Sequence, residues 1–294
     1  MTAILTDYLR LVRFSHSIFA LPFALASAWV AQGGVPEART GALVVVCAVA
    51  ARTAAMGFNR LVDRRIDAQN PRTVGRELPS GKLTPWQVGA LVLMSSAVFV
   101  IAAFALNPLA GQLSMPVLAV LLGYSLAKRF TWAVHLWLGL SLALAPLGAW
   151  VAVRGHLDGD LLPPLALAGA VLTWVAGFDL IYACQDAGFD RERGLHSIPA
   201  RFGVARALRA SAILHGITVP LLIAFGLSAG LGVAFTAALL VTTSLLVWQH
   251  RLVRPDDLSR VDVAFFTLNG WIGVLLFVGV AIDLALGSNF LGAH

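Results

Sequence analysis

The chain has 294 residues, of which 59% are hydrophobic and only 12% are charged, and its mean hydropathy is +0.82. Soluble domains carry about 25% charged residues, so this composition excludes an ordinary soluble domain and indicates a membrane protein. The net charge of +6 does not indicate nucleic-acid binding, because the basic residues lie in short loops between apolar runs, where they favour anionic headgroups and an anionic substrate.

A membrane-spanning helix needs about 20 mostly apolar residues, and nine runs of the chain approach that length. The runs cover residues 14–32, 41–62, 85–106, 111–127, 132–153, 161–185, 205–226, 229–249 and 262–286. Only Asn107, Pro108 and a few neighbours separate the third run from the fourth, which predicts a tight helical hairpin. We therefore predict one all-α domain over residues 1–294, a polytopic membrane bundle of about nine helices; a count of eight or ten stays open.

The Lys and Arg residues lie mainly on one side of these runs. Most of the 21 fall in the N-terminal segment and in the loops after the second, fourth, sixth and eighth runs, whereas the other side has only Arg39 and Arg154. Because Lys and Arg favour cytoplasmic loops, we expect a cytoplasmic N-terminus in a bacterial-type inner (plasma) membrane, with the basic loops on the cytoplasmic side.

Polar motifs end the second and sixth runs. Residues 57–59 (GFN) and 177–179 (GFD) each open into an Arg-rich loop, a faint internal repeat that suggests two half-sites. At about 100° per residue, Asn59, Asp63 and Asp67 share one helical face. The residues of a second stripe with helical spacing are Asp179, Tyr182, Asp186 and Asp190.

Carboxylates this close together need a counter-charge. They repel one another, and an ionised Asp costs about 2.5–3.5 kcal/mol at the bilayer centre and less near the interface. Carboxylate and amide oxygens suit Mg²⁺, which prefers a few carboxylates together with the phosphate oxygens of a substrate. The stripes therefore predict a magnesium-bound diphosphate site. For Asp67 and Asp190 taken alone, an interfacial cap or a loop charge stays an open alternative.

Basic residues follow the stripes and complete the predicted diphosphate site. Guanidinium groups bind phosphate through two parallel hydrogen bonds, and Lys acts as a point charge. Each of these residues taken singly also fits a topology signal, but together they converge with the carboxylates on one membrane side. The candidates are Arg72, Arg76, Lys128, Arg129 and Arg201. The loop at 68–82 fits either a lid or a plain connector.

Further residues near the stripes are candidates for contact with substrate. A buried Arg is rare in hydrocarbon and marks a functional site; for Arg52 we favour binding to the carboxylate of an aromatic acid, with pairing to a site Asp as the structural alternative. A departing diphosphate leaves cation character on the prenyl C1, which aromatic faces stabilise. The candidates for that role are Tyr124, Phe178 and Tyr182, and Asp179 of the second stripe joins the substrate-contact set.

These motifs resemble those of the UbiA superfamily of membrane prenyltransferases, whose signatures are Asn-Asp-x-x-Asp-x-x-x-Asp and Asp-x-x-x-Asp. The likeness spans the chain and is strongest over residues 52–81 and 179–203. The runs MGFNRLVD and GLHSIPARFG are similar to those of 4-hydroxybenzoate polyprenyltransferases and, more closely, to the menaquinone enzymes of the futalosine route, which prenylate a dihydroxynaphthoate. Two positions depart from the pattern: Arg60 replaces the Asp that usually follows the motif Asn, and His196 replaces a Lys.

The resemblance implies Mg²⁺-dependent transfer of a polyprenyl group from polyprenyl diphosphate to a hydroxylated aromatic acid, 4-hydroxybenzoate or 1,4-dihydroxy-6-naphthoate, in ubiquinone or menaquinone biosynthesis. It also implies that Arg52 faces the acceptor. The residues that it implies as holders of two Mg²⁺ ions are Asn59, Asp63, Asp67, Asp186 and Asp190, with the four Asp residues catalytic. Haem, chlorophyllide, homogentisate or glycerol phosphate acceptors stay open, and a secondary transporter is the rival class. The expected partners are the two substrates and the lipid bilayer, with no nucleic acid and no known protein partner.

Overall fold

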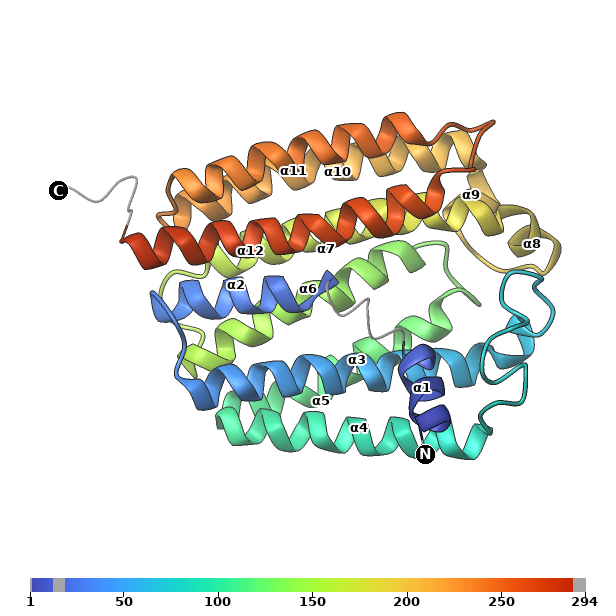
Figure 1. Ribbon diagram of the computed structural model, residues 1–294, viewed down its shortest axis with the longest axis horizontal. Helices are drawn as coiled ribbons and strands as arrows, with labels where there is room; N and C mark the ends of the chain where they lie inside the picture. Colours follow the sequence, from blue (N-terminus) through green and yellow to red (C-terminus); the bar gives the residue numbers. More distant parts are fainter. Residues whose placement is uncertain (1, 13–18, 288–294) are drawn as a thin grey trace.

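The computed structural model describes residues 2–12 and 19–287, and helices make up most of this part of the chain (Figure 1). The long helices lie side by side along the long axis of the molecule. They are α2 (Leu21–Gln32), α3 (Ala38–Asp67), α4 (Pro85–Leu106), α5 (Pro108–Ala127), α6 (Val134–Arg154), α7 (Leu162–Ala183), α10 (Val204–Ser228), α11 (Val233–Leu252) and α12 (Asn269–Leu286). The shorter ones are α1 (Thr2–Leu11), the 3₁₀ turn η2 (Cys184–Asp186), α8 (Ala187–Glu192), α9 (Ile198–Phe202) and the π-helix η3 (Val263–Leu268).

Eight helices of the described part are long and apolar enough to cross a membrane. They fall on the second to ninth apolar runs, so the predicted all-α membrane bundle is confirmed. In the range of the first run, 14–32, the helix α2 has 12 residues and is shorter than a span; residues 13–18 lie outside the described residues. The extent of the single domain, 1–294, stays a prediction.

Neighbouring helices close into a circuit. From α2 to α7 each helix packs against the next, α7 packs against α10, and α10, α11 and α12 follow in order before α12 returns to α2. Helix α2 also reaches across the circuit to pack on α6. Helices α3 and α7 both end on the right in Figure 1, where loop 68–84, α8 and α9 lie as well. Both acidic motifs therefore come to the same end of the bundle.

The outward faces of the long helices are apolar. Leu93, Ile101, Ile213 and Leu240 are among the large hydrophobic side chains that stay exposed. Lipid tails cover such side chains in a bilayer, while the helical backbone satisfies its own hydrogen bonds there. The exposed apolar surface therefore agrees with a membrane location.

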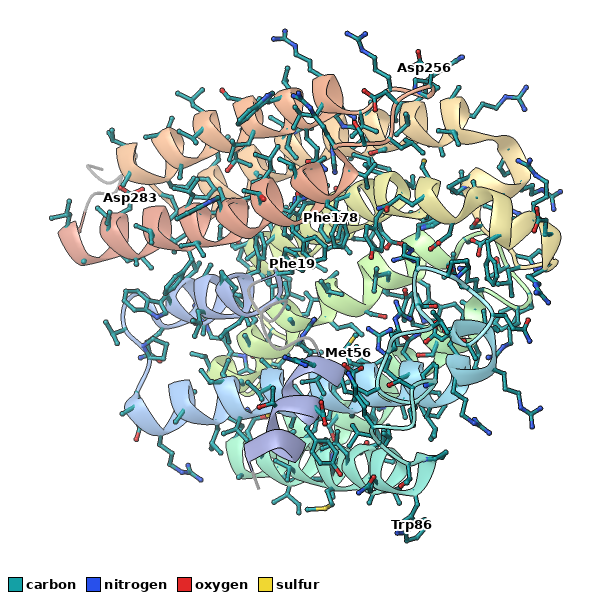
Figure 2. All side chains as sticks on the ribbon, turned by 45° about the vertical axis from the view of Figure 1, so that its right-hand side comes forward. Phe19, Met56, Trp86, Phe178, Asp256 and Asp283 are labelled. Atoms are coloured by element: carbon teal, nitrogen blue, oxygen red, sulfur yellow. The ribbon has the colours of Figure 1, made fainter. Side chains whose placement is uncertain are left out.

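Helix α7 lies in the interior and carries the aromatic part of the core. Its Trp174 and Phe178 are almost fully buried, with ring centres 5.0 Å apart. Phe178 lies close to Phe19 at the start of the α2 segment (Figure 2), with ring centres 5.5 Å apart, and 5.2 Å from Phe265 on η3. Aromatic side chains thus fill the space between α7, the α2 segment and η3, just inside the end with the acidic motifs.

Helices α6 and α7 approach each other very closely at Gly139. A Cβ atom there would lie 2.3 Å from the carbonyl oxygen of Leu172 on α7. Only glycine allows this distance, because any side chain would meet a backbone atom that cannot rotate away. On α6, Gly139 lies one turn after His135. On α7, Leu172 lies seven residues before Asp179.

Asn107 forms the predicted hairpin between α4 and α5. Its Oδ1 accepts a hydrogen bond from the Ala110 N–H at 2.8 Å, which caps α5. Its Nδ2 donates to the carbonyl of Val151 at 2.9 Å, which ties the hairpin to the end of α6.

A carboxylate from α12 caps α11 at the opposite end of the bundle. Asp283 is buried and accepts hydrogen bonds from the N–H groups of Gly232 at 2.8 Å, Ala234 at 3.1 Å and Phe235 at 2.8 Å. The first N–H groups of a helix have no partner inside the helix, and a negative charge there is favourable. Asp283 therefore has a structural role.

Candidate active site

The acidic side chains of the first stripe lie along the last two turns of α3. Asn59 Nδ2 donates a hydrogen bond to Asp63 Oδ2 over 3.1 Å. Arg129 Nη2 pairs with Asp63 Oδ1 at 3.0 Å, and one turn later Arg76 Nη1 pairs with Asp67 Oδ1 at 2.7 Å. Asn59 and Asp63 therefore share a face, as their spacing predicts, and both carboxylates already hold a basic side chain.

The second stripe is not one continuous helix. Helix α7 ends at Ala183, the 3₁₀ turn η2 ends at Asp186, and α8 carries Asp190. A 3₁₀ turn has about 3.0 residues per turn instead of about 3.6, so it rotates α8 relative to α7. The uniform helical spacing predicted from Asp179 to Asp190 is therefore wrong beyond Ala183.

Asp186 is held by the loop that follows the other stripe. Arg72 Nε donates to Asp186 Oδ1 at 3.0 Å, and a second nitrogen of the same guanidinium pairs with Oδ2. Asn70 Nδ2 also donates to Asp186 Oδ1, at 3.2 Å, while Asn70 Oδ1 accepts the N–H of Arg72 at 2.9 Å. The paired geometry is the one that guanidinium groups use for carboxylates and phosphates.

Asp190 is the most buried of these carboxylates, with 1% of its side chain exposed. Lys128 Nζ lies 2.7 Å from its Oδ1, and Ser197 Oγ donates to its Oδ2 at 3.0 Å. The backbone N–H of His196 donates to the carbonyl of Lys128 at 2.8 Å. The loop before α9 is thus fastened to the turn between α5 and α6.

These ion pairs cross between the two stripes. In the loop after α3, Arg72 pairs with Asp186 of the second stripe, and Arg76 pairs with Asp67 of the first stripe. The turn after α5 does the same with two consecutive residues, since Lys128 pairs with Asp190 and Arg129 with Asp63. The structure therefore brings both stripes and four of the five predicted diphosphate-binding residues into one cluster.

Tyr182 joins this cluster to the aromatic core. Its hydroxyl accepts a hydrogen bond from Arg72 Nη1 at 2.6 Å, and the guanidinium carbon lies 5.0 Å from its ring centre. Its ring stacks on Phe265 of η3 with centres 4.3 Å apart. Burial lowers the pKa of Arg72, but the hydrogen bond and charge of Asp186 outweigh burial and raise that pKa above its ordinary value, so Arg72 keeps its charge.

Comparison with known proteins assigns the family. The model of the UbiA prenyltransferase family matches residues 20–272. The chain belongs to the UbiA prenyltransferase family. It is 34% identical over 292 residues to a 4-hydroxybenzoate octaprenyltransferase of Ectopseudomonas mendocina, covering 95% of this chain and 94% of that one.

Solved UbiA homologues share the fold. The apo structure of a UbiA homologue from Aeropyrum pernix K1 is 35% identical, has a TM-score of 0.83, and the match covers 92% of this chain and 98% of that one. A UbiA homologue from Archaeoglobus fulgidus bound to GPP and Mg²⁺ has a TM-score of 0.74 over 95% of this chain and 99% of that one, at 20% identity. The predicted resemblance to the UbiA superfamily is confirmed, and the UbiA-family chain is a prenyltransferase rather than a secondary transporter.

Three further residues predicted for the site of this UbiA-family chain do not take part in the ion pairs of the cluster. Arg52 is half-buried on α3, seven residues before Asn59. Tyr124 is half-buried on α5. Arg201 differs from the other basic candidates, because it is exposed on α9 and its guanidinium lies over the ring of Phe202, 5.4 Å from the centre.

Three polar residues of the cluster were not predicted from the sequence. Asn70 precedes a proline and folds the loop so that Arg72 reaches Asp186. Ser197 caps α9 and also holds Asp190; a Ser followed by Pro at the second helical position is a signal for such a cap. His135 Nδ1 lies 2.7 Å from Asp179 Oδ2. No local spacing links this His to that Asp, so the sequence gives no signal for the pair.

The donor set suits Mg²⁺. The acidic stripes supply carboxylate and amide oxygens, which that ion prefers. Asp67 is buried, and its Oδ2 has no hydrogen-bond partner among the described residues, so one oxygen is available for a ligand. Within the described part of the chain, no three His, Cys, Asp or Glu side chains lie close enough to hold an ion between them. The basic side chains instead pair with the carboxylates.

Proposed function

We propose that the protein transfers a polyprenyl group from a polyprenyl diphosphate to a ring carbon of a hydroxylated aromatic acid, with Mg²⁺ as cofactor. One observation carries the proposal: acidic side chains from α3 and from the η2–α8 segment, together with basic side chains from two loops, form a single cluster at one end of a membrane bundle. Such a cluster has both the positive groups that a diphosphate needs and the oxygens that its cation needs.

The basic side chains would bind the diphosphate. Arg72, Arg76, Lys128 and Arg129 each hold a carboxylate, and diphosphate oxygens would take the place of that carboxylate. Mg²⁺ held by Asn59, Asp63, Asp67, Asp186 and Asp190 would supply positive charge to the departing diphosphate. A structural neighbour from Archaeoglobus fulgidus was solved with GPP and Mg²⁺, which supports this choice of donor and ion. For the exposed Arg201 we propose only a contact with the outer edge of the diphosphate.

The aromatic side chains would shield the reacting carbon. Tyr182 lies directly under Arg72, and Phe178 and Phe265 extend the aromatic surface inward. Aromatic faces stabilise a cation and exclude water from it. A prenyl chain would follow the apolar interior away from the charged cluster.

An aromatic acid is the proposed acceptor. Arg52 lies two helical turns deeper than Asn59, where its guanidinium would bind the acid's carboxylate. Tyr124 on α5 would line the same space. The curated relative is named for 4-hydroxybenzoate, which supports this acid; 1,4-dihydroxy-6-naphthoate is the alternative, and it would place the enzyme in menaquinone rather than ubiquinone synthesis.

We also propose that the cluster faces the cytoplasm and that the membrane is the bacterial inner membrane. The basic loops that form the cluster belong to the side richer in Lys and Arg, which is the cytoplasmic side under the positive-inside rule.

A direct assay tests the function. Purified protein in detergent is given one labelled prenyl diphosphate, Mg²⁺ and a panel of acceptors, and products are identified by mass spectrometry. We expect a C-prenylated hydroxybenzoate or dihydroxynaphthoate, with no product after chelation of the metal or in the Asp63→Asn variant. The Asp256→Asn variant, changed on an exposed loop, is the matched control. Product with haem, chlorophyllide, homogentisate or glycerol phosphate alone, or none with any acceptor, would overturn the proposal.

A further inference from the structure

The turn that leads into α12 is not α-helical. It is the π-helix η3, and regular α-helix begins only at Asn269. In a π-helix the backbone hydrogen bonds span five residues instead of four, a geometry that is rare and occurs mostly as single turns, frequently at functional sites. The turn packs against α7, the helix that leads to the second acidic stripe. The proposed function uses an aromatic side chain of η3 but gives no reason for its unusual backbone.

Phe265 of η3 lies at the centre of a group of aromatic rings. Its ring stacks on Tyr182, with centres 4.3 Å apart. It meets three further rings edge-on, those of Phe178 at 5.2 Å, Phe19 at 5.9 Å and Phe266 at 4.6 Å. Because the hydroxyl of Tyr182 belongs to the charged cluster, Phe265 joins that cluster to the aromatic core.

Asn269 holds η3 from inside the bundle. Its side chain is 0% exposed, and its Nδ2 donates to the carbonyl oxygens of Ala264 at 2.9 Å and Phe265 at 3.0 Å. Its Oδ1 accepts the indole N–H of Trp174 on α7 at 2.8 Å. Removing this amide would leave buried carbonyls and a buried N–H without a partner, which costs more than the hydrogen bonds themselves contribute.

The amide therefore fixes how η3 is rotated against α7. Trp174 and Phe265, the residues that Asn269 connects, both contact the ring of Phe178. An α-helix and a π-helix place successive side chains at different angles about the axis. A return of η3 to α-helical spacing would therefore turn Phe265 away from Tyr182.

We infer that Asn269 is a positioning residue for prenyl transfer, because it holds η3 as a π-helix and so keeps Phe265 stacked on Tyr182, beside the prenyl C1. This inference rests on the proposed function. When the C1–O bond breaks, its electron pair leaves with the diphosphate, and C1 then bonds either to the acceptor ring or to water. Water forms a C–O bond at C1, loses a proton to the solvent and gives the prenyl alcohol. Aromatic faces stabilise the cation and exclude water, so their position sets the ratio of the two products.

The test measures the ratio of prenyl alcohol to prenylated acid. Wild type, Asn269→Leu, Phe265→Leu and the double variant are purified in detergent and given labelled prenyl diphosphate, Mg²⁺ and either 4-hydroxybenzoate or 1,4-dihydroxy-6-naphthoate, and both products are quantified by mass spectrometry. Unfolded protein makes neither product, so a loss of stability alone leaves the ratio unchanged. Asn107→Leu is the matched control, because this Asn also donates to two backbone carbonyls and accepts one N–H, at the opposite end of the bundle.

We expect the ratio to rise about fivefold or more in Asn269→Leu, the scale of losing one aromatic face from a cation, and to stay unchanged in Asn107→Leu. KM for the donor should stay close to that of wild type, because the basic side chains are intact. Phe265→Leu should show a similar rise and the double variant no further rise, since effects that pass through one contact do not add. Hydrogen exchange over residues 263–268 should be faster in Asn269→Leu than in Asn107→Leu.

A second variant tests the other end of the bridge. Trp174→Phe removes the indole N–H and keeps an aromatic ring, so the ratio should rise by a smaller factor than in Asn269→Leu. If Asn269→Leu does not fold, Trp174→Phe carries the test.

The outcomes separate this inference from the proposed function. An active wild type with an unchanged ratio in Asn269→Leu and Trp174→Phe would overturn the inference and leave Asn269 only a structural role. A double variant whose rise equals the product of the two single rises would also overturn it, because Asn269 would not act through Phe265. A wild type that prenylates no aromatic acid would instead remove the proposed function, and the inference with it.

Discussion

Lys128 and Arg129 are consecutive residues, yet their side chains hold carboxylates of different helices: Lys128 Nζ lies 2.7 Å from Asp190, and Arg129 Nη2 lies 3.0 Å from Asp63. The turn between α5 and α6 therefore connects α8 with the end of α3. A change in this turn acts on both acidic stripes, which makes it a direct place to test how the cluster is held.

Lys128→Met should destabilise the protein more than Arg129→Met. Asp190 is 1% exposed and Asp63 is 22% exposed. Loss of one partner of a buried pair costs about 3–5 kcal/mol, whereas an exposed pair contributes about 1 kcal/mol or less. Thermal unfolding in a single detergent measures both variants, and Lys128→Arg, which keeps the charge, is the control. Equal shifts for the two Met variants would contradict this account.

Asp186→Asn should open the loop between α3 and α4. The substitution removes the charged acceptor that holds Arg72. Hydrogen bonds to charged groups contribute about 1.5–3 kcal/mol, so the open loop should become about tenfold or more populated. Limited trypsin digestion measures cleavage after Arg72. Asp257→Asn, on an exposed loop, should leave the cleavage unchanged; a similar rate in Asp186→Asn and wild type would show that the pair does not hold the loop.

Gly139→Ala should destabilise the packing of α6 on α7. The new Cβ would lie 2.3 Å from the carbonyl oxygen of Leu172, so the helices must separate. Overpacking of this kind costs about 1–3 kcal/mol. Gly148→Ala is the matched control on the same helix, since a Cβ there meets nothing within 4 Å. Thermal unfolding in detergent should separate the two variants, and a Tm for Gly139→Ala at or above that of Gly148→Ala would refute the close contact.

Asp67→Asn should raise the requirement for magnesium. Asp67 Oδ2 is buried and has no hydrogen-bond partner in the described part of the chain, which makes it an available metal ligand. Even residues that only support a metal ligand change metal affinity about 10–100-fold, so half-maximal activity should need at least about tenfold more Mg²⁺. A titration of activity with Mg²⁺ measures this, with Asp262→Asn, at the exposed start of η3, as control. An unchanged Mg²⁺ titration would remove Asp67 from the metal site.

Much of the fold was predictable because it depends on local properties of the sequence. Apolar runs of about 20 residues predict spans wherever they occur, and eight of the nine lie where they were expected. The first stripe was predictable for the same reason, because Asn59 and Asp63 sit on one regular helix and their contact follows from a spacing of four residues.

The partners within the site were not predictable in this way. Arg72 reaches Asp186 across 114 residues, and His135 reaches Asp179 across 44. Such contacts depend on how the helices close into a circuit, which periodicity does not encode. The 3₁₀ turn before Asp186 also breaks a spacing that assumes one helix. Arg201 follows the second stripe and lies in a different basic segment from the other candidates, where α9, which begins after the cap at Ser197, places its guanidinium over the ring of Phe202.

The contacts of Asp283 bear on how the protein is made. Gly232 is synthesised 51 residues before the carboxylate that binds its N–H, so the first turn of α11 stays incomplete until those further residues have been made. Those backbone amides enter an apolar environment, where an unsatisfied N–H is strongly unfavourable. Insertion of α11 and α12 as one hairpin provides the acceptor in time, and a chain that stops before Asp283 lacks it.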